Sequence, residues 1–205
     1  MLDRVTLNAR KPEQDEYGNA VLERMNESHY ELTQWGLSHV DPKAAADILD
    51  IGCGGGRTIN GFLTNTDAKV CGIDFSDASV AKTIELNKAF VEAGRASITK
   101  GTAESLPYPE NSFDLVTAFE TVYYWVEPTE CFKKVLSTLR EKGEFLVCNE
   151  DKDRSRPVVA QFADALGMTL YSAEELGGFM KAAGFTEVRT YEHENGLWVC
   201  AVGKK

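Results

Sequence analysis

The sequence contains no hydrophobic run close to the length that crosses a bilayer. A spanning helix needs about 20 consecutive, mostly apolar residues, and none of the apolar runs in this chain of 205 residues is that long. The first residues, MLDRVTLNARKPEQDE, also lack the apolar stretch of a secretory signal peptide. We therefore expect a cytoplasmic protein without a membrane partner.

Cysteine pairs and histidines, which build most structural metal sites, are scarce. The five cysteines form no CxxC motif, and there are only three histidines. Four of the cysteines fall in apolar runs, which favours buried free thiols over a disulfide or a metal site. The sequence predicts no metal ligands.

Positive charge is also in short supply. Lysine and arginine number 22 against 32 acidic residues, which gives a formal net charge of −10. Proteins that bind nucleic acids draw most of their affinity from basic side chains at the phosphates, so no nucleic-acid partner is expected. The length and the 43% of hydrophobic residues are typical of one globular domain.

Apolar runs alternate with amphipathic stretches along most of the chain. Strands are expected at 46–51, 68–74, 96–102, 113–120 and 143–150. Their continuous apolar character is typical of parallel strands that are covered on both faces. The pattern predicts an α/β fold with right-handed crossovers.

Helices are expected before and between these strands. Apolar residues recur every three or four positions over 13–36, which predicts one N-terminal helix. Further helices are expected over 57–65, from the capping residue Ser76 to Gly94, and over 128–143, with Pro at its start and Gly at its end.

The last part of the chain has a different pattern. Residues 151–168 read as an irregular or helical insertion over the carboxyl ends of the strands, and 172–185 as an amphipathic helix. The runs 186–192 and 197–205 are separated only by HENG, which predicts a hairpin.

A glycine-rich turn follows the first strand, with glycine at positions 52, 54, 55 and 56. Glycine lets a ligand approach the backbone, and ligands of open α/β sheets bind beside the first strand at its carboxyl end. A dinucleotide fingerprint would need glycine at position 57, where the sequence has Arg57. Asp50 would repel a pyrophosphate and favours an ammonium group instead.

Asp74 ends the second strand, where a carboxylate can accept both hydroxyl hydrogens of a ribose. This arrangement suits NAD as well as S-adenosylmethionine. The alternative is that Asp74 only favours the start of the following helix.

Four segments, ILDIGCGGGRTI, GIDFS, GTAESLPYPENSFDLV and GEFLVCNE, resemble successive motifs of class I S-adenosylmethionine-dependent methyltransferases. The resemblance runs from about residue 46 to 150. It implies a doubly wound, mostly parallel seven-stranded sheet in the order 3-2-1-4-5-7-6, with the last strand antiparallel and helices on both faces. It also implies one domain over 1–205, in which 1–45 form a helical lid, 46–150 the cofactor-binding core, and 151–205 an insertion, a helix and a hairpin.

The cofactor implied by the resemblance is S-adenosyl-L-methionine, with S-adenosyl-L-homocysteine as the product. The glycine turn would hold its methionine part, Asp74 its ribose, and Phe75 would lie beside the adenine. The family usually has an acid where this sequence has Thr102, which leaves the adenine to the Ala103 N–H and to Glu104. The cofactor-binding residues implied in this way are Asp50, Gly52, Cys53, Gly54, Asp74, Phe75, Thr102, Ala103, Glu104 and Glu120.

Methyl transfer from a sulfonium is an in-line displacement in which the enzyme mainly aligns the reactants, and it requires no metal. A lid that excludes water assists it, and the N-terminal helix is the candidate. On this helix His29 is the candidate general base, because its pKa lies near neutrality. An ordinary surface histidine is the equal alternative.

Polar and aromatic residues follow the fourth and fifth strands, at the edge expected to face the acceptor. Glu120 and Tyr124 join His29 as catalytic candidates, Asn149 and Glu150 lie nearby, and Trp125 is interpreted as a core residue. Such a pocket favours a cationic or amine-bearing acceptor. ETVY stands where methyltransferases of DNA amino groups have (N/D)PPY, which argues against that chemistry.

The predicted function is therefore methyl transfer to a small-molecule acceptor. A non-catalytic S-adenosylmethionine-binding regulator is the first alternative. An NAD-dependent oxidoreductase is less favoured, because Asp50 and Arg57 argue against it.

Overall fold

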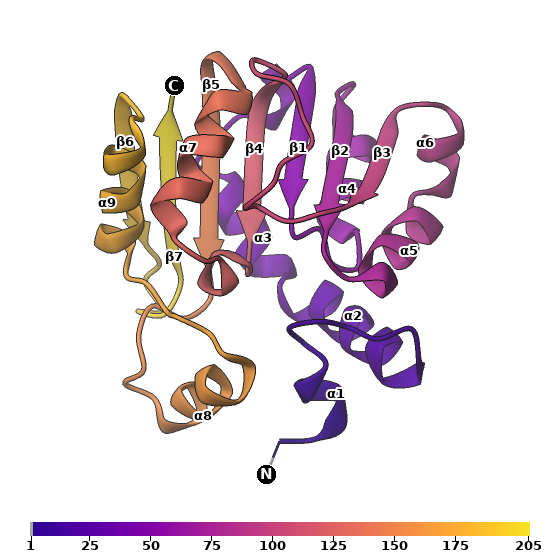
Figure 1. The fold of residues 1–205 in the computed structure, drawn as a ribbon, viewed down its shortest axis with the longest axis vertical. Coiled ribbons are helices and arrows are strands. Elements are labelled where there is room, and N and C mark those ends of the chain that lie inside the picture. The colour runs from indigo at the N-terminus through magenta and orange to yellow at the C-terminus, as the bar shows by residue number, and fades with distance from the viewer. Residues whose placement is uncertain (1) are drawn as a thin grey trace.

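Seven strands form one sheet in the order β3-β2-β1-β4-β5-β7-β6 in the computed structural model, which describes residues 2–205 (Figure 1). β7 runs antiparallel to both of its neighbours, and the other pairs are parallel. This order and the antiparallel last strand confirm the predicted fold. The strands are β1 (Asp47–Ile51), β2 (Lys69–Asp74), β3 (Ala96–Lys100), β4 (Phe113–Phe119), β5 (Leu139–Asn149), β6 (Glu187–Glu192) and β7 (Val199–Lys204).

Helices cover both faces of the sheet, which explains why the central strands are apolar throughout. On one face α7 (Pro128–Thr138) and α9 (Ala173–Ala183) enclose a core around Phe132 and Phe145. Trp125 packs edge-on against Phe132 in this core. On the other face α4 (Arg57–Asn65) buries Ile59 and Phe62 against β1 and β2. α5 (Asp77–Leu86) and α6 (Lys88–Glu92) pack beside β3.

The N-terminal segment contains α1 (Arg4–Leu7), α2 (Glu16–Ser28) and α3 (Tyr30–Leu37). α1 and α2 lie beyond the carboxyl ends of the parallel strands, whereas α3 lies against the sheet (Figure 1). The predicted single helix over 13–36 is therefore wrong. The helix is interrupted at His29, which has φ −90° and ψ 5°, because α2 packs against α5 while α3 packs against β5.

Two other predicted helix boundaries are wrong. The helix after Ser76 is interrupted at Asn87, which lies between α5 and α6. α7 ends at Thr138, and the LREKG that follows belongs to β5. Arg140 draws this stretch into the sheet, because its guanidinium pairs with the carboxylates of Asp47, at 2.8 Å, and Asp114, at 2.9 Å.

The insertion after β5 contains α8 (Pro157–Leu166), which lies beyond the same end of the parallel strands as α1 and α2 (Figure 1). Arg10 joins the two segments by donating a hydrogen bond to the Leu166 carbonyl at 3.4 Å. The five cysteines are free thiols. Among the described residues, none of the helices has the length and apolarity needed to cross a membrane.

Candidate active site

A cavity of about 580 Å³ lies at the carboxyl ends of β1, β2 and β4. Its floor includes the glycine turn, Asp50 just before this turn, Asp74 at the end of β2, and the residues after β4. α2, α3 and the segment around Arg10 cover it. Its volume is within the range of roughly 300–1,000 Å³ that is usual for small-molecule sites.

The backbone of the glycine turn is open to this cavity at Gly54. Gly52 and Gly54 have φ values of +77° and +51°, which favour glycine. A Cβ on Gly52 would lie 2.6 Å from the Thr121 hydroxyl, whereas a Cβ on Gly54 would meet only the Gly52 carbonyl, at 4.0 Å. The space above Gly54 is therefore available to a ligand.

Asn26 and Arg57 attach α2 to this turn. The Asn26 amide donates to the Gly55 carbonyl, and the Arg57 guanidinium donates to the Asn26 carbonyl, each at 3.1 Å. The guanidinium also lies 4.3 Å from the centre of the Tyr30 ring. Arg57, which departs from the dinucleotide fingerprint, thus helps to fix the helix that covers the cavity.

Asp50 is buried at the end of β1, and its carboxylate accepts a 2.6 Å hydrogen bond from the Thr117 hydroxyl. Burial, together with the nearby Asp74, raises the pKa of Asp50 to about 7, although the hydrogen bond from Thr117 opposes the rise. A positively charged ligand group at this position would stabilise the ionised carboxylate.

This pKa shift predicts that Asp50→Asn stabilises the protein in a pH-dependent way. The folded state binds the Asp50 proton more tightly than the unfolded state, so Asp50 lowers stability as pH rises from its ordinary pKa towards 7. The free energy of unfolding of the variant, relative to the parent, should be larger at pH 8 than at pH 5 by about 2 kcal/mol. Urea denaturation at both values measures it, and an equal difference at both would contradict the assignment.

Asp74 shapes the turn and also faces the cavity. One carboxylate oxygen accepts from the Gly54 N–H and the other from the Ser76 N–H, both at 2.9 Å. Burial raises its pKa, and these two N–H groups oppose the rise. Each oxygen keeps a further lone pair for a ligand. Ser76 is the N-cap of α5, so this contact also supports the alternative, in which Asp74 favours the start of that helix.

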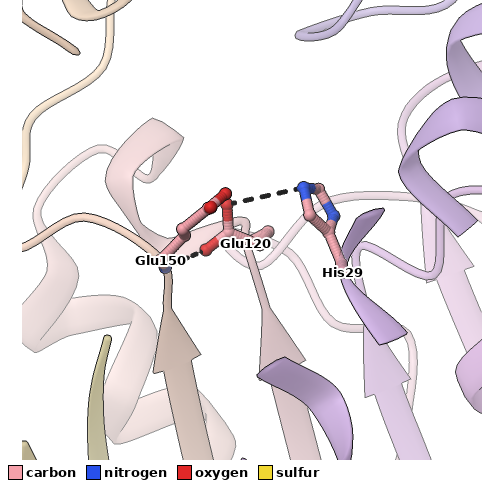
Figure 2. A group of neighbouring side chains, drawn as sticks. All are labelled: His29, Glu120 and Glu150. Carbon is pink, nitrogen blue, oxygen red and sulfur yellow. Dashed lines mark hydrogen bonds and ion pairs between the residues drawn. The ribbon is translucent and has the colours of Figure 1, made fainter. Parts of the chain in front are cut away.

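Glu120 directly follows β4 with φ +55°, a conformation that residues with a side chain rarely adopt. One carboxylate oxygen accepts from the Glu150 N–H and the other from the Tyr123 hydroxyl, at 3.2 Å. The latter oxygen, Oε2, also lies 3.9 Å from His29 Nε2 (Figure 2). Burial raises the pKa of Glu120 to about 7.

The other residues predicted at the acceptor end surround Glu120. Burial lowers the pKa of His29, so its imidazole is neutral at pH 7. Burial raises the pKa of Tyr124, whose ring centre lies 5.4 Å from the Arg10 guanidinium. Burial and the neighbouring Glu120 raise the pKa of Glu150.

The structure places most of the predicted site residues around one cavity. Its lining includes Asp50, Gly52, Cys53, Gly54, Asp74, Phe75, Glu120, Tyr124 and His29. Thr102, Ala103 and Glu104 are absent from that lining among the described residues. The Glu104 carboxylate accepts from the Val126 N–H at 3.1 Å, and Ala103 is buried in the core. Their contact with adenine stays a prediction.

Sequence reasoning missed the segment before α2. Ala9, Arg10 and Pro12 line the cavity, and the Ser76 hydroxyl donates to the Pro12 carbonyl at 2.6 Å. Thr121 was missed as well. Neither has a sequence signal, because each reaches the cavity through contacts between distant parts of the chain.

Comparison with known families agrees with this arrangement. A family model described as a methyltransferase domain matches residues 42–184, which is well over half of the chain. The chain belongs to this methyltransferase family. The resemblance to class I methyltransferases is thereby confirmed.

Curated methyltransferases are similar to most of this chain. An O-methyltransferase, cnsE, from Penicillium expansum is 26% identical over 149 residues, which are 71% of this chain and 54% of that protein. Phosphoethanolamine N-methyltransferase 3 from Arabidopsis thaliana is 29% identical over 164 residues, 77% of this chain and 32% of that protein. The chain therefore spans about half of the length of the first relative and about a third of the second.

Solved methyltransferase structures share the fold. One is a methyltransferase in complex with the Haloferax volcanii Trm112 methyltransferase activator, with a TM-score of 0.80, 16% identity, and coverage of 100% of this chain and 98% of that one. Another is phosphoethanolamine N-methyltransferase 2 from Haemonchus contortus, solved with phosphomonomethylethanolamine and S-adenosylhomocysteine. Its TM-score is 0.80 at 14% identity, over 100% of this chain and 61% of that one.

Proposed function

We propose that the protein transfers the methyl group of S-adenosyl-L-methionine to a small-molecule acceptor. The observation that carries this proposal is that one cavity contains both the glycine turn with its two buried acids and the cluster of His29, Glu120 and Tyr124. In-line displacement needs cofactor and acceptor side by side. The relatives named as an O-methyltransferase and as a phosphoethanolamine N-methyltransferase support the same class of reaction.

The residues around the turn have the chemistry that this cofactor requires. The open backbone at Gly54 admits the methionine part, and Asp50 offers a negative charge to its ammonium group. The free lone pairs of Asp74 would accept the ribose hydroxyls. The cofactor itself supplies a methyl group that its sulfonium has already activated.

At the other end of the cavity, the protein positions the acceptor and takes up its proton. As the acceptor forms a bond to the methyl carbon, the carbon–sulfur bond breaks, and S-adenosylhomocysteine leaves as a neutral thioether. Neutral His29 and the ionised form of Glu120 can each receive the acceptor's proton. The covering segment before β1 acts as the lid that keeps water out.

Labelled methyl transfer tests this proposal. The protein is incubated with methyl-labelled S-adenosylmethionine and a cell extract that is separated into small metabolites and macromolecules. We expect label in the small-metabolite fraction, and about a 100-fold lower rate for Glu120→Gln. Glu141→Gln, an exposed glutamate outside the cavity, is the control.

Label that enters only the macromolecules would contradict a small-molecule acceptor. Tight binding of S-adenosylhomocysteine without any transfer would favour a non-catalytic regulator. Our expectations of a cytoplasmic location and of no nucleic-acid partner stay predictions.

A further inference from the structure

Three side chains from separate elements converge beside the cavity, and two of them, His29 and Glu120, line it (Figure 2). His29 comes from the junction of α2 and α3, Glu120 from the end of β4, and Glu150 from the end of β5. Each offers one nitrogen or oxygen atom, and these three atoms all lie within 4.8 Å of one another. One imidazole and two carboxylates are thus directed at a common point.

We infer that His29, Glu120 and Glu150 form a binding site for a divalent transition-metal ion. The sequence predicts no such site, because nothing in the spacing of these residues resembles a metal-binding motif. The site stands on its own geometry, whereas its role in catalysis rests on the proposed function.

The charge around the cluster favours a cation. Among residues 2–205, neither Glu120 nor Glu150 forms an ion pair with a lysine or arginine. The nearby Arg156 is paired with Asp151, and Arg10 donates to the Leu166 carbonyl. Two neighbouring carboxylates that are partly removed from water repel each other. A divalent ion between them offsets this repulsion.

The three groups are also prepared to act as ligands. The imidazole of His29 offers a ring nitrogen, the commonest kind of metal ligand in proteins. The side chain of Glu120 is only 9% exposed. Hydrogen bonds from the Glu150 N–H and the Tyr123 hydroxyl hold its carboxylate, and such bonds commonly orient metal-binding carboxylates. The left-handed backbone of Glu120 is the kind of strained conformation that is found at functional sites.

The ligand set favours Mn²⁺ or Zn²⁺ over Mg²⁺ and Ca²⁺, which prefer oxygen ligands alone. Bonds of about 2.0–2.2 Å would require the three side chains to move together by roughly an ångström. Three protein ligands leave coordination positions open, as in catalytic zinc sites. An ion here would therefore bind and polarise an oxygen atom of the acceptor. His29 would then serve as a ligand rather than as a base.

Calorimetric titration of the full chain with Mn²⁺ and, separately, with Zn²⁺ tests the inference, after bound metal has been removed with a chelator. We expect one ion per chain, with a dissociation constant in the micromolar range or below. His29→Ala and Glu150→Gln should each weaken binding at least 10-fold. Glu31→Gln, an exposed glutamate that does not line the cavity, should leave it unchanged.

The absence of saturable binding for both ions would overturn the inference, and so would equal affinity in Glu150→Gln and the parent protein. A parallel titration with S-adenosylhomocysteine, in the presence of chelator, separates this result from the proposed function. The cofactor residues lie around the glycine turn, so Glu150→Gln should bind it as the parent does. Failure of the parent to bind it would contradict the proposed function and leave the metal site standing.

Discussion

Asp74→Ala is expected to weaken the binding of S-adenosylhomocysteine at least about 100-fold. The substitution removes the carboxylate oxygens that would accept the ribose hydroxyls. It also leaves the half-buried N–H group of Gly54 and the buried N–H group of Ser76 without their acceptor. Losing hydrogen bonds to a charged group, and leaving buried donors unpaired, costs about 1–3 kcal/mol for each group. Isothermal calorimetry measures the effect.

Two further variants make this result interpretable. Asp77→Ala removes an exposed acid that pairs with Lys100 at 2.7 Å, a surface pair worth at most about 1 kcal/mol, and should bind as the parent does. Asp74→Asn keeps the size of the side chain and one acceptor oxygen, so it should fold and still lose about 10-fold in affinity. Unchanged affinity in both Asp74 variants would show that this residue only supports the start of α5.

Gly54→Ala should also abolish most of the cofactor affinity, by about 100-fold. The added Cβ meets nothing within the protein closer than 4.0 Å, so it projects into space that we assign to the cofactor. Steric exclusion of the ligand, rather than internal clash, is the expected cause. Calorimetric titration with S-adenosylhomocysteine measures it.

Gly94→Ala is a matched control for this variant. Gly94 has φ +71° and open space around its Cβ position, but it lies outside the cavity lining. Both substitutions should cost about 1–2 kcal/mol of stability, because both place a Cβ in the left-handed region. Only Gly54→Ala should lose affinity. Equal affinities in the two variants would remove Gly54 from the cofactor site.

The sheet was predictable because its strands carry apolar runs wherever helices cover both faces, as in β1 and β4. The helix boundaries were less predictable from the sequence. The break at His29 follows from α2 and α3 packing on different elements. The early end of α7 follows from Arg140 bridging Asp47 and Asp114. Both causes are contacts between distant residues, which local propensity does not encode.

The candidate site was also only partly predictable from the sequence. The glycine turn, Asp50 and Asp74 lie within a short stretch around β1 and β2, so their spacing indicated a ligand site. The convergence of His29, Glu120 and Glu150 depends on how α2 crosses the strand ends, and no local sequence pattern indicates it. The carboxylate of Glu104 accepts from the Val126 N–H, and the expected contact of Glu104 with the adenine stays a prediction.

The identity of the cofactor is the claim on which the rest depends, and calorimetric titration of S-adenosylhomocysteine and of NADH into the purified protein tests it most directly. We predict micromolar binding of S-adenosylhomocysteine and no binding of NADH, because Asp50 would repel a pyrophosphate at the glycine turn. Binding of NADH without S-adenosylhomocysteine would contradict the account.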